Sequence, residues 1–218
     1  MVIYMDFEFD NNVYEVIIEK KNNKNLYIRV TDDLKIKVTC PYLYSKKMIK
    51  DIINNNSKSI IRMINSKIKE NNRHIKDENK LLDKDINVIY KDVKKPLFDG
   101  LNLKIKDKNM LDKWYKEKAL QLFQIYLDEA YDVFEEKIPY PKLKVRKMKT
   151  RWGVCNKRDN SVTLNLDLIK KDPSYLNYVI VHELSHFVHF NHSKSFWQLV
   201  EKYCPEYKKV RKDLKEYV

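Results

Sequence analysis

The sequence predicts an α+β protein, in which a small β-meander with a helix region precedes a second region built from helices and a short sheet. Short alternating apolar runs fill residues 2–39, and a three-to-four apolar spacing fills residues 111–134. Two strand-like runs are then followed by a helix start at Asp172 and Pro173. We therefore expect an N-terminal region over residues 1–105 and a second domain over residues 106–218.

The N-terminal region reads as strands first and helix second. Apolar residues alternate with polar ones between clusters of Asp, Asn and Lys, which favours an antiparallel β-meander over residues 2–39. Residues 45–72 have an apolar spacing typical of one or two helices, and the polar residues 69–80 indicate a loop. Weaker strand patterns follow at residues 86–90 and 101–105. The abundance of Lys, Asn and Ile, which extends over the whole chain, indicates no chemistry by itself.

The second region contains the stronger patterns. Residues 111–134 predict a long amphipathic helix, and two prolines, Pro139 and Pro141, end it. Residues 142–148 and 161–168 alternate as strands do. Asp172 then serves as an N-cap, and Pro173 occupies the first helical position, where its missing N–H costs nothing.

Composition excludes several classes of function. The 218 residues include 44 Lys and Arg against 31 Asp and Glu, a net charge of +13, so the surface should attract anionic partners. Two glycines, Gly100 and Gly153, are too few for a phosphate-cradling loop, and the three cysteines are expected to be reduced thiols. The first residues carry no basic signal region, and no apolar run is long enough to cross a membrane. We expect a cytoplasmic protein that does not enter the membrane.

The helix that begins at Pro173 carries an HExxH pattern formed by His182, Glu183 and His186. Residues four apart lie on one helix face, so both imidazoles can reach a single zinc ion. Glu183 is rotated about 100° from His182, where a carboxylate could hold a water and act as general base. Four of the five histidines fall within residues 182–192, so an accidental match is the weaker interpretation.

A catalytic zinc takes a third protein ligand, and two histidines compete for this role. His189 lies about 10.5 Å along the helix axis from His182, too far for one tetrahedral shell. His192 follows Asn191, which we expect to end the helix in a left-handed conformation and turn the chain back. A further helix over residues 193–204, with Ser195 and Gln198 at capping-box spacing, would fix this turn. We predict His192 as the third ligand.

These residues and their surroundings resemble the YgjP-like zinc-dependent metallopeptidases, a bacterial zincin family. The shared pattern covers the last third of the chain, and it consists of Thr150-Arg151-Trp152-Gly153-Val154-Cys155, Leu164-Asn165, Tyr178, the HExxH residues, Asn191-His192-Ser193, Phe196-Trp197 and Pro205. The resemblance implies a zincin-like metallopeptidase domain that hydrolyses peptide bonds, with zinc as cofactor and a peptide or protein as substrate.

The resemblance also implies where a substrate would lie. In zincins an edge strand before the active-site helix pairs with an extended peptide, and residues 162–166 occupy that place here. This assigns substrate contacts to Val162, Leu164 and Asn165, although core packing or loop anchoring is the favoured interpretation for Asn165. Arg151 could meet a substrate carboxylate or carbonyl, or tie its own loop to an acid.

An alternative function belongs to a different class. Basic residues over 142–151 lead into the expected active-site loop and could bind nucleic-acid phosphates. The protein would then be a nucleic-acid-associated zinc protein, either a protease acting on DNA-bound proteins or a non-catalytic zinc-binding module. A solvated strand face in a Lys-rich chain explains the same residues.

Overall fold

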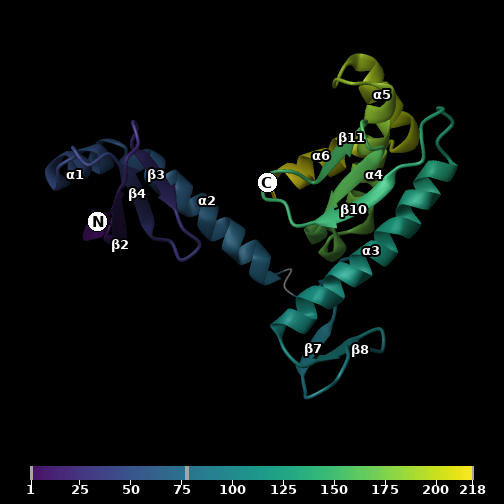
Figure 1. Ribbon diagram of the computed structural model, residues 1–218, viewed down its shortest axis with the longest axis horizontal. Helices are drawn as coiled ribbons and strands as arrows, with labels where there is room; N and C mark the ends of the chain where they lie inside the picture. The colour runs from purple at the N-terminus through teal and green to yellow at the C-terminus, as the bar shows by residue number, and fades with distance from the viewer. Residues whose placement is uncertain (1, 77–78, 218) are drawn as a thin grey trace. The chain divides into compact units, whose positions relative to one another are not determined.

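The computed structural model describes residues 2–76 and 79–217. The chain divides into two compact units, Met1–Lys76 and Asp77–Val218, each with its own hydrophobic core (Figure 1). We call them the N-terminal and the C-terminal unit. The division falls between residues 76 and 77, whereas the sequence led us to expect it between residues 105 and 106.

The N-terminal unit opens with a four-stranded sheet formed by β1 (Val2–Phe9), β2 (Asn12–Lys20), β3 (Tyr27–Val30) and β4 (Ile36–Cys40). Its order is β1-β2-β4-β3, and β2 pairs with β4 in parallel. The expectation of an antiparallel meander is therefore wrong at this pair. Alternation predicts which side chains face the core, but β4 lies at the centre because it buries apolar side chains beside those of β2.

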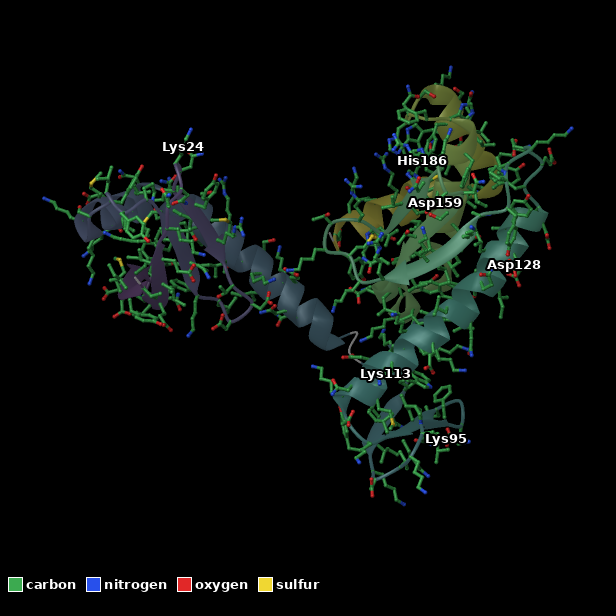
Figure 2. All side chains as sticks on the ribbon, in the orientation of Figure 1. Lys24, Lys95, Lys113, Asp128, Asp159 and His186 are labelled. Carbon is green, nitrogen blue, oxygen red and sulfur yellow. The ribbon has the colours of Figure 1, made fainter. Side chains whose placement is uncertain are left out.

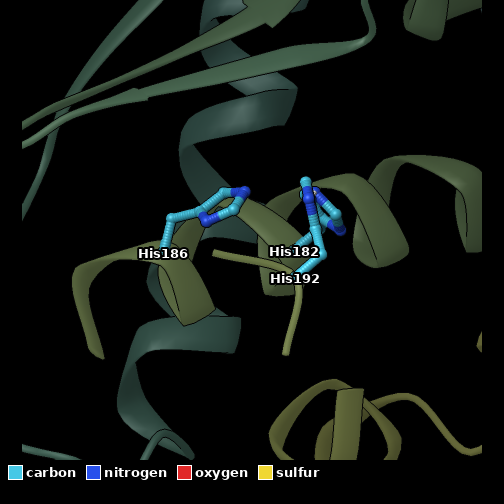
Figure 3. A group of neighbouring side chains, drawn as sticks. All are labelled: His182, His186 and His192. Carbon is cyan, nitrogen blue, oxygen red and sulfur yellow. Dashed lines mark hydrogen bonds between the residues drawn. The ribbon is translucent and has the colours of Figure 1, made fainter. Parts of the chain in front are cut away.

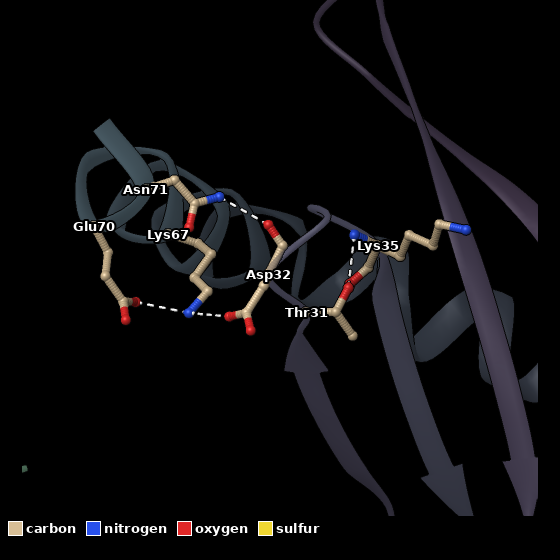
Figure 4. A network of polar contacts seen from close by, with 6 residues as sticks. All are labelled: Thr31, Asp32, Lys35, Lys67, Glu70 and Asn71. Carbon is tan, nitrogen blue, oxygen red and sulfur yellow. Dashed lines mark hydrogen bonds and ion pairs between the residues drawn. The ribbon is translucent and has the colours of Figure 1, made fainter. Parts of the chain in front are cut away.

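Two helices cover this sheet, α1 (Lys46–Asn55) and α2 (Ser57–Lys76), and they bury four isoleucines in its core: Ile49, Ile53, Ile60 and Ile64. A polar network joins α2 to the turn between β3 and β4 (Figure 4). The Asn71 side-chain amide donates a hydrogen bond to the backbone carbonyl of Asp32 at 2.8 Å. Nζ of Lys67 lies 2.8 Å from Oε2 of Glu70 and 2.5 Å from Oδ1 of Asp32. These contacts hold the late turns of α2.

The loop expected over residues 69–80 is mostly absent. Residues 69–76 continue α2, residues 77–78 lie outside the described part of the chain, and β5 begins at Lys80. One of the polar side chains that favoured a loop, Asn71, instead donates a hydrogen bond from the helix to the neighbouring turn.

Two small sheets begin the C-terminal unit. β5 (Lys80–Leu81) pairs with β6 (Lys84–Asp85), and β7 (Asn87–Tyr90), β8 (Leu97–Phe98) and β9 (Asn102–Ile105) form a sheet of order β7-β9-β8. Ile86, Leu103 and Ile105 are buried in the same core as the helices that follow. This shared core places residues 79–105 in the C-terminal unit. It explains why the two units divide at a lower residue number than the sequence predicted.

The long helix expected from the sequence is α3 (Lys108–Asp132), capped by Asp107. Asp128 lies near the far end of this helix (Figure 2). Its carboxylate accepts a hydrogen bond from the Tyr140 hydroxyl at 2.5 Å, which anchors the segment after the helix. β10 (Lys142–Arg146), β11 (Gly153–Asn156) and β12 (Ser161–Asn165) then form a sheet of order β10-β12-β11. A 3₁₀ turn, η1 (Leu166–Lys170), leads to the next helix.

β12 is the central strand of that sheet, parallel to β10 and antiparallel to β11. We had expected residues 162–166 to form an edge strand, and this is wrong. All five residues of β12 are buried, and both of its sides carry partner strands, so it cannot accept an added peptide strand. The edges belong to β10 and β11.

α4 (Pro173–Val188) carries the HExxH residues, and it packs against α3, β11, α5 (Lys194–Tyr203) and α6 (Tyr207–Lys215). Asp172 caps it by accepting from the Ser174 N–H at 2.8 Å, as expected. The helix ends at His189 in an extended conformation, and Asn191 has no positive φ, so the predicted left-handed turn is wrong. Ser193, not Ser195, caps α5.

No helix in the described part of the chain combines the length and the apolar character that crossing a bilayer requires.

Candidate metal centre and active site

Three histidines converge at the end of α4 (Figure 3). His182 and His186 come from successive turns of the helix, and His192 comes from the loop that follows it. Ring centroids lie 4.9 Å apart for His182 and His186, 5.0 Å for His182 and His192, and 4.8 Å for His186 and His192. One ligand atom from each residue lies within 4.8 Å of the others. The structure thus brings together all three residues that the sequence singled out as ligands.

The loop from α4 to α5 aims His192 at the other two rings. Phe196, which is fully buried, contacts all three imidazoles with centroid distances of 4.9, 4.6 and 4.8 Å. Trp197 stacks on His192 at 5.5 Å with the two planes 20° apart. Because the cap at Ser193 starts α5 directly after His192, this aromatic pair fixes the position of the third ring.

His189 contributes through its backbone. Its carbonyl oxygen lies 3.2 Å from Nδ1 of His186. A carbonyl oxygen can only accept a hydrogen bond, so Nδ1 must carry the ring hydrogen and donate it. This leaves Nε2 of His186 as the atom with a free lone pair, which is the orientation that a ligating imidazole needs. Within the described residues, the His189 side chain is not part of the histidine cluster.

The chemistry of these donors fits a divalent cation. Burial lowers the pKa of His182 to about 3, and it also lowers the pKa of His186, so both rings stay neutral at physiological pH. Nε2 of His182 and Nε2 of His192 lie 3.1 Å apart. Two nitrogens on one tetrahedral zinc are separated by about 3.3 Å, given bonds of roughly 2.05 Å. His192 is exposed, which leaves one side of the cluster open.

Glu183 is only 5% exposed, and its carboxylate points at β11. The backbone N–H of Cys155 donates a hydrogen bond to it, and a Cβ placed on Gly153 would lie 2.5 Å from its Oε1. Burial raises the pKa of Glu183 to about 7, against the opposing effects of the Cys155 hydrogen bond and Arg151. A carboxyl group in this range can accept and return a proton near neutral pH.

A comparison with models of protein families shows the family of the chain. The model of the YgjP-like metallopeptidase domain matches residues 24–217. The chain belongs to the YgjP-like metallopeptidase family. It is therefore a peptidase of a metal-dependent class, and membership of the family implies a divalent metal.

Two solved structures are also similar to the chain. One is the metallopeptidase zymogen of Pyrococcus abyssi abylysin, with 26% identity and a TM-score of 0.39 over 42% of this chain and 90% of that one. The other is the metallopeptidase zymogen of Methanocaldococcus jannaschii jannalysin, with 20% identity and a TM-score of 0.39 over 44% of this chain and 97% of that one. A comparison with curated proteins found no match.

The residues expected to bind substrate divide into two groups in this YgjP-like protein. Val162 and Leu164 have no exposed surface and Asn165 is 3% exposed, so the structure contradicts their assignment to substrate contact. The Asn165 amide donates to the backbone carbonyls of Met148 and Arg151 at 2.8 and 2.9 Å. Asn165 is thus a loop anchor, and the loop it holds carries Arg151 to the wall of a cavity beside His182 and Glu183.

Sequence reasoning missed the residues that position Glu183. Gly153 belongs to the quoted family pattern and is one of two glycines, but that signal did not reveal its contact with a helix thirty positions away. The Cys155 N–H left no sequence signal, because every non-proline residue carries one.

The basic residues over 142–151 gain no positive support from the structure as a nucleic-acid-binding surface. Lys142, Lys144 and Arg146 are exposed on β10, but Lys144 is already paired with Asp159, at the turn before β12 (Figure 2). Binding of nucleic acid by this face stays a prediction.

Proposed function

We propose that the protein is a zinc-dependent metallopeptidase that hydrolyses peptide bonds in peptide or protein substrates. The observation that carries the proposal is the convergence of three imidazoles beside one buried carboxylate, in a chain of a metallopeptidase family. His182, His186 and His192 would hold the metal. Neutral imidazole nitrogens suit zinc, whereas magnesium and calcium prefer oxygen ligands.

Zinc bound at three protein ligands supplies a Lewis acid that lowers the pKa of water toward neutrality. The protein's own contribution is to place and restrain the groups around it. His186 is held by the His189 carbonyl, and His192 is held by the rings of Phe196 and Trp197. A metal site whose ligands are preset in this way loses little affinity to reorganisation.

Glu183 is proposed as the general base, which takes a proton from the attacking water and gives it to the leaving amine. Its position supports this role because the residue follows His182 directly and its carboxylate packs closely against Gly153 of β11. Burial also raises the pKa of this carboxyl group to about 7, which suits a group that must accept a proton and then return it.

The test compares wild type with Glu183→Gln on a peptide library, each protein loaded with zinc. We expect about one zinc per chain in both proteins, and cleavage by wild type only. The loss in rate should be at least roughly 10²- to 10⁴-fold, the usual contribution of a general base. Mass spectrometry of the library and metal analysis of the proteins provide the two measurements.

Glu129→Gln is the matched control, because Glu129 is an exposed acid on α3 outside the site. It should cleave as wild type does. Full activity in Glu183→Gln would show that Glu183 is not the base. Absence of any cleavage by zinc-loaded wild type, across a library that samples all residue pairs, would refute the peptidase itself.

A further inference from the structure

A cavity of about 300 Å³ opens directly beside His182 and Glu183 in the C-terminal unit. Its walls come from α4, from α6, and from the loop before β11 together with the first residue of that strand, Gly153. Three of the lining side chains are cationic, namely Arg151 on the loop and Arg211 and Lys215 on α6. Glu183 is the one acid that lines it, and its carboxylate is buried against β11.

The three cations have no acidic partner in the described part of the chain. Residues 2–76 and 79–217 place no carboxylate oxygen within ion-pair distance of Arg151, Arg211 or Lys215. The Arg211 guanidinium lies 4.4 Å from the centre of the Trp197 ring, so an aromatic face and not an acid orients it. All three residues are exposed, and their donors are therefore available to a ligand.

Their arrangement on α6 is unfavourable for the helix alone. Arg211 and Lys215 are four residues apart and lie on the same face, where two like charges repel. An anion between them would remove this repulsion and gain charge-assisted hydrogen bonds.

A hydrogen bond links two of the segments that form the wall of the cavity. The Trp152 indole N–H donates to the backbone carbonyl of Leu214 at 3.2 Å, which ties the loop before β11 to the last turn of α6. Leu214 and Val179 add apolar surface to the lining. A cation-lined pocket with an apolar floor suits a carboxylate carried on a short aliphatic stem.

We propose that this cavity is a substrate subsite for a carboxylate close to the scissile bond, provided either by an acidic side chain or by a free peptide C-terminus. The inference rests on the proposed peptidase function, and it adds a substrate class to it. Arg211 and Lys215 supply the charge, and Arg151 flanks the group from the loop.

The experiment measures binding without turnover, in zinc-loaded Glu183→Gln protein. Fluorescent peptides with blocked ends carry a single glutamate at each position in turn, and their counterparts carry glutamine. A third set carries glutamine and a free C-terminus. We expect one glutamate position, or the free C-terminus, to bind roughly 10- to 100-fold tighter than the blocked glutamine peptide. Tighter binding of a blocked glutamate peptide would identify an acidic side chain as the source of the carboxylate. Tighter binding of the glutamine peptide with a free C-terminus would identify the peptide terminus.

Lys215→Gln and Arg211→Gln, each placed in the same background, should reduce this preference at least several-fold. Lys212→Gln is the matched control, since Lys212 is an exposed cation of α6 that does not line the cavity. Lys215 is the decisive position if Arg211→Gln loosens Trp197, because Lys215 is exposed at the last residue of the helix.

The outcomes separate the two proposals. Equal affinity for charged and neutral peptides, or a preference that survives Lys215→Gln and Arg211→Gln, overturns the subsite. A charge preference that both substitutions abolish supports the subsite, even if wild type cleaves nothing. Cleavage by wild type without any preference supports the peptidase and overturns the subsite.

Discussion

The two units of the molecule differ in the polar side chains that they bury. Among the described residues, every buried polar or charged side chain belongs to the C-terminal unit, and these residues are Ser161, Thr163, Asn165, Lys171, Glu183 and Ser185. The core of the N-terminal unit is formed by apolar side chains of its sheet and two helices. Its ion pairs, such as those of Glu19, involve side chains that are at least partly exposed.

This difference indicates which unit performs chemistry. Burying a carboxyl group costs free energy, and the cost is retained where the group has a task. Glu183 is such a buried carboxyl group, and the buried amide of Asn165 holds the loop that leads to the site. The family model nevertheless begins at residue 24 and spans both units, so the N-terminal unit is part of what the family shares.

Removing a histidine of the cluster should produce the largest effect. His192→Ala deletes one of three converging donors, so metal affinity should fall by more than the roughly 10- to 100-fold that loss of a supporting residue causes. Peptide cleavage should be lost with it. Equilibrium dialysis followed by metal analysis measures the affinity.

His189→Ala is the matched comparison, because it removes a neighbouring imidazole and keeps the backbone carbonyl that contacts His186. It should bind metal as wild type does. If His189→Ala lost the metal and His192→Ala retained it, the ligand role would pass to His189.

Gly153→Ala tests how closely Glu183 must be held. The added Cβ would lie 2.5, 2.7 and 2.8 Å from Oε1, Cγ and Cδ of Glu183, so the stem of the side chain must move and not only its tip. A displacement near 1 Å costs roughly 10²-fold in rate. We expect kcat to fall by about that factor, while metal binding by the three histidines is unchanged.

Gly100→Ala is the control, since it alters the chain's other glycine. Gly100 has φ of +103° with nothing within 4 Å of a new Cβ, so its substitution strains a turn and should cost stability by about 1 to 3 kcal/mol without reducing kcat. A Gly153→Ala enzyme with normal kcat would show that the contact has no catalytic consequence.

Local patterns predicted the helix of the site well. The cap at Asp172, the proline at position 173 and the spacing of His182 and His186 are all properties of neighbouring residues, and the structure has them as expected. His192 was also placed correctly beside the other two, although the expected reason was wrong. The helix ends at His189 in an extended conformation, and aromatic packing from α5 completes the turn.

Pairing between strands was predicted poorly, because it depends on distant segments. Alternation indicated that residues 161–165 form a strand, but it could not show that β10 and β11 flank it on both sides. The same limit concealed the parallel pair of β2 and β4, and the cations of α6 that line the cavity. In a chain with 44 Lys and Arg, two more cations carry no signal until the fold brings them beside the site.

The smallest expected effect concerns a surface charge of the N-terminal unit. Glu19 lies 2.9 Å from Lys21 and 2.5 Å from Lys37, and the hydrogen bond from Lys37, followed by that from Lys21, lowers its pKa from 4.5 to about 2. A carboxyl group with a depressed pKa stabilises the folded state above its unfolded pKa, and this contribution is lost as the pH falls through the folded value. The window therefore lies between about pH 4.5 and pH 2.

Glu19→Gln should consequently be less stable than wild type at pH 6, and the difference in stability should shrink as the pH falls toward 2 and vanish below it. Urea unfolding followed by far-ultraviolet circular dichroism measures this difference. All three tryptophans, Trp114, Trp152 and Trp197, belong to the C-terminal unit, so their fluorescence reports on that unit alone. If Glu19→Gln shifted the fluorescence transition as much as the dichroism transition, the two units would unfold together. The substitution in one unit would then change the stability of the other.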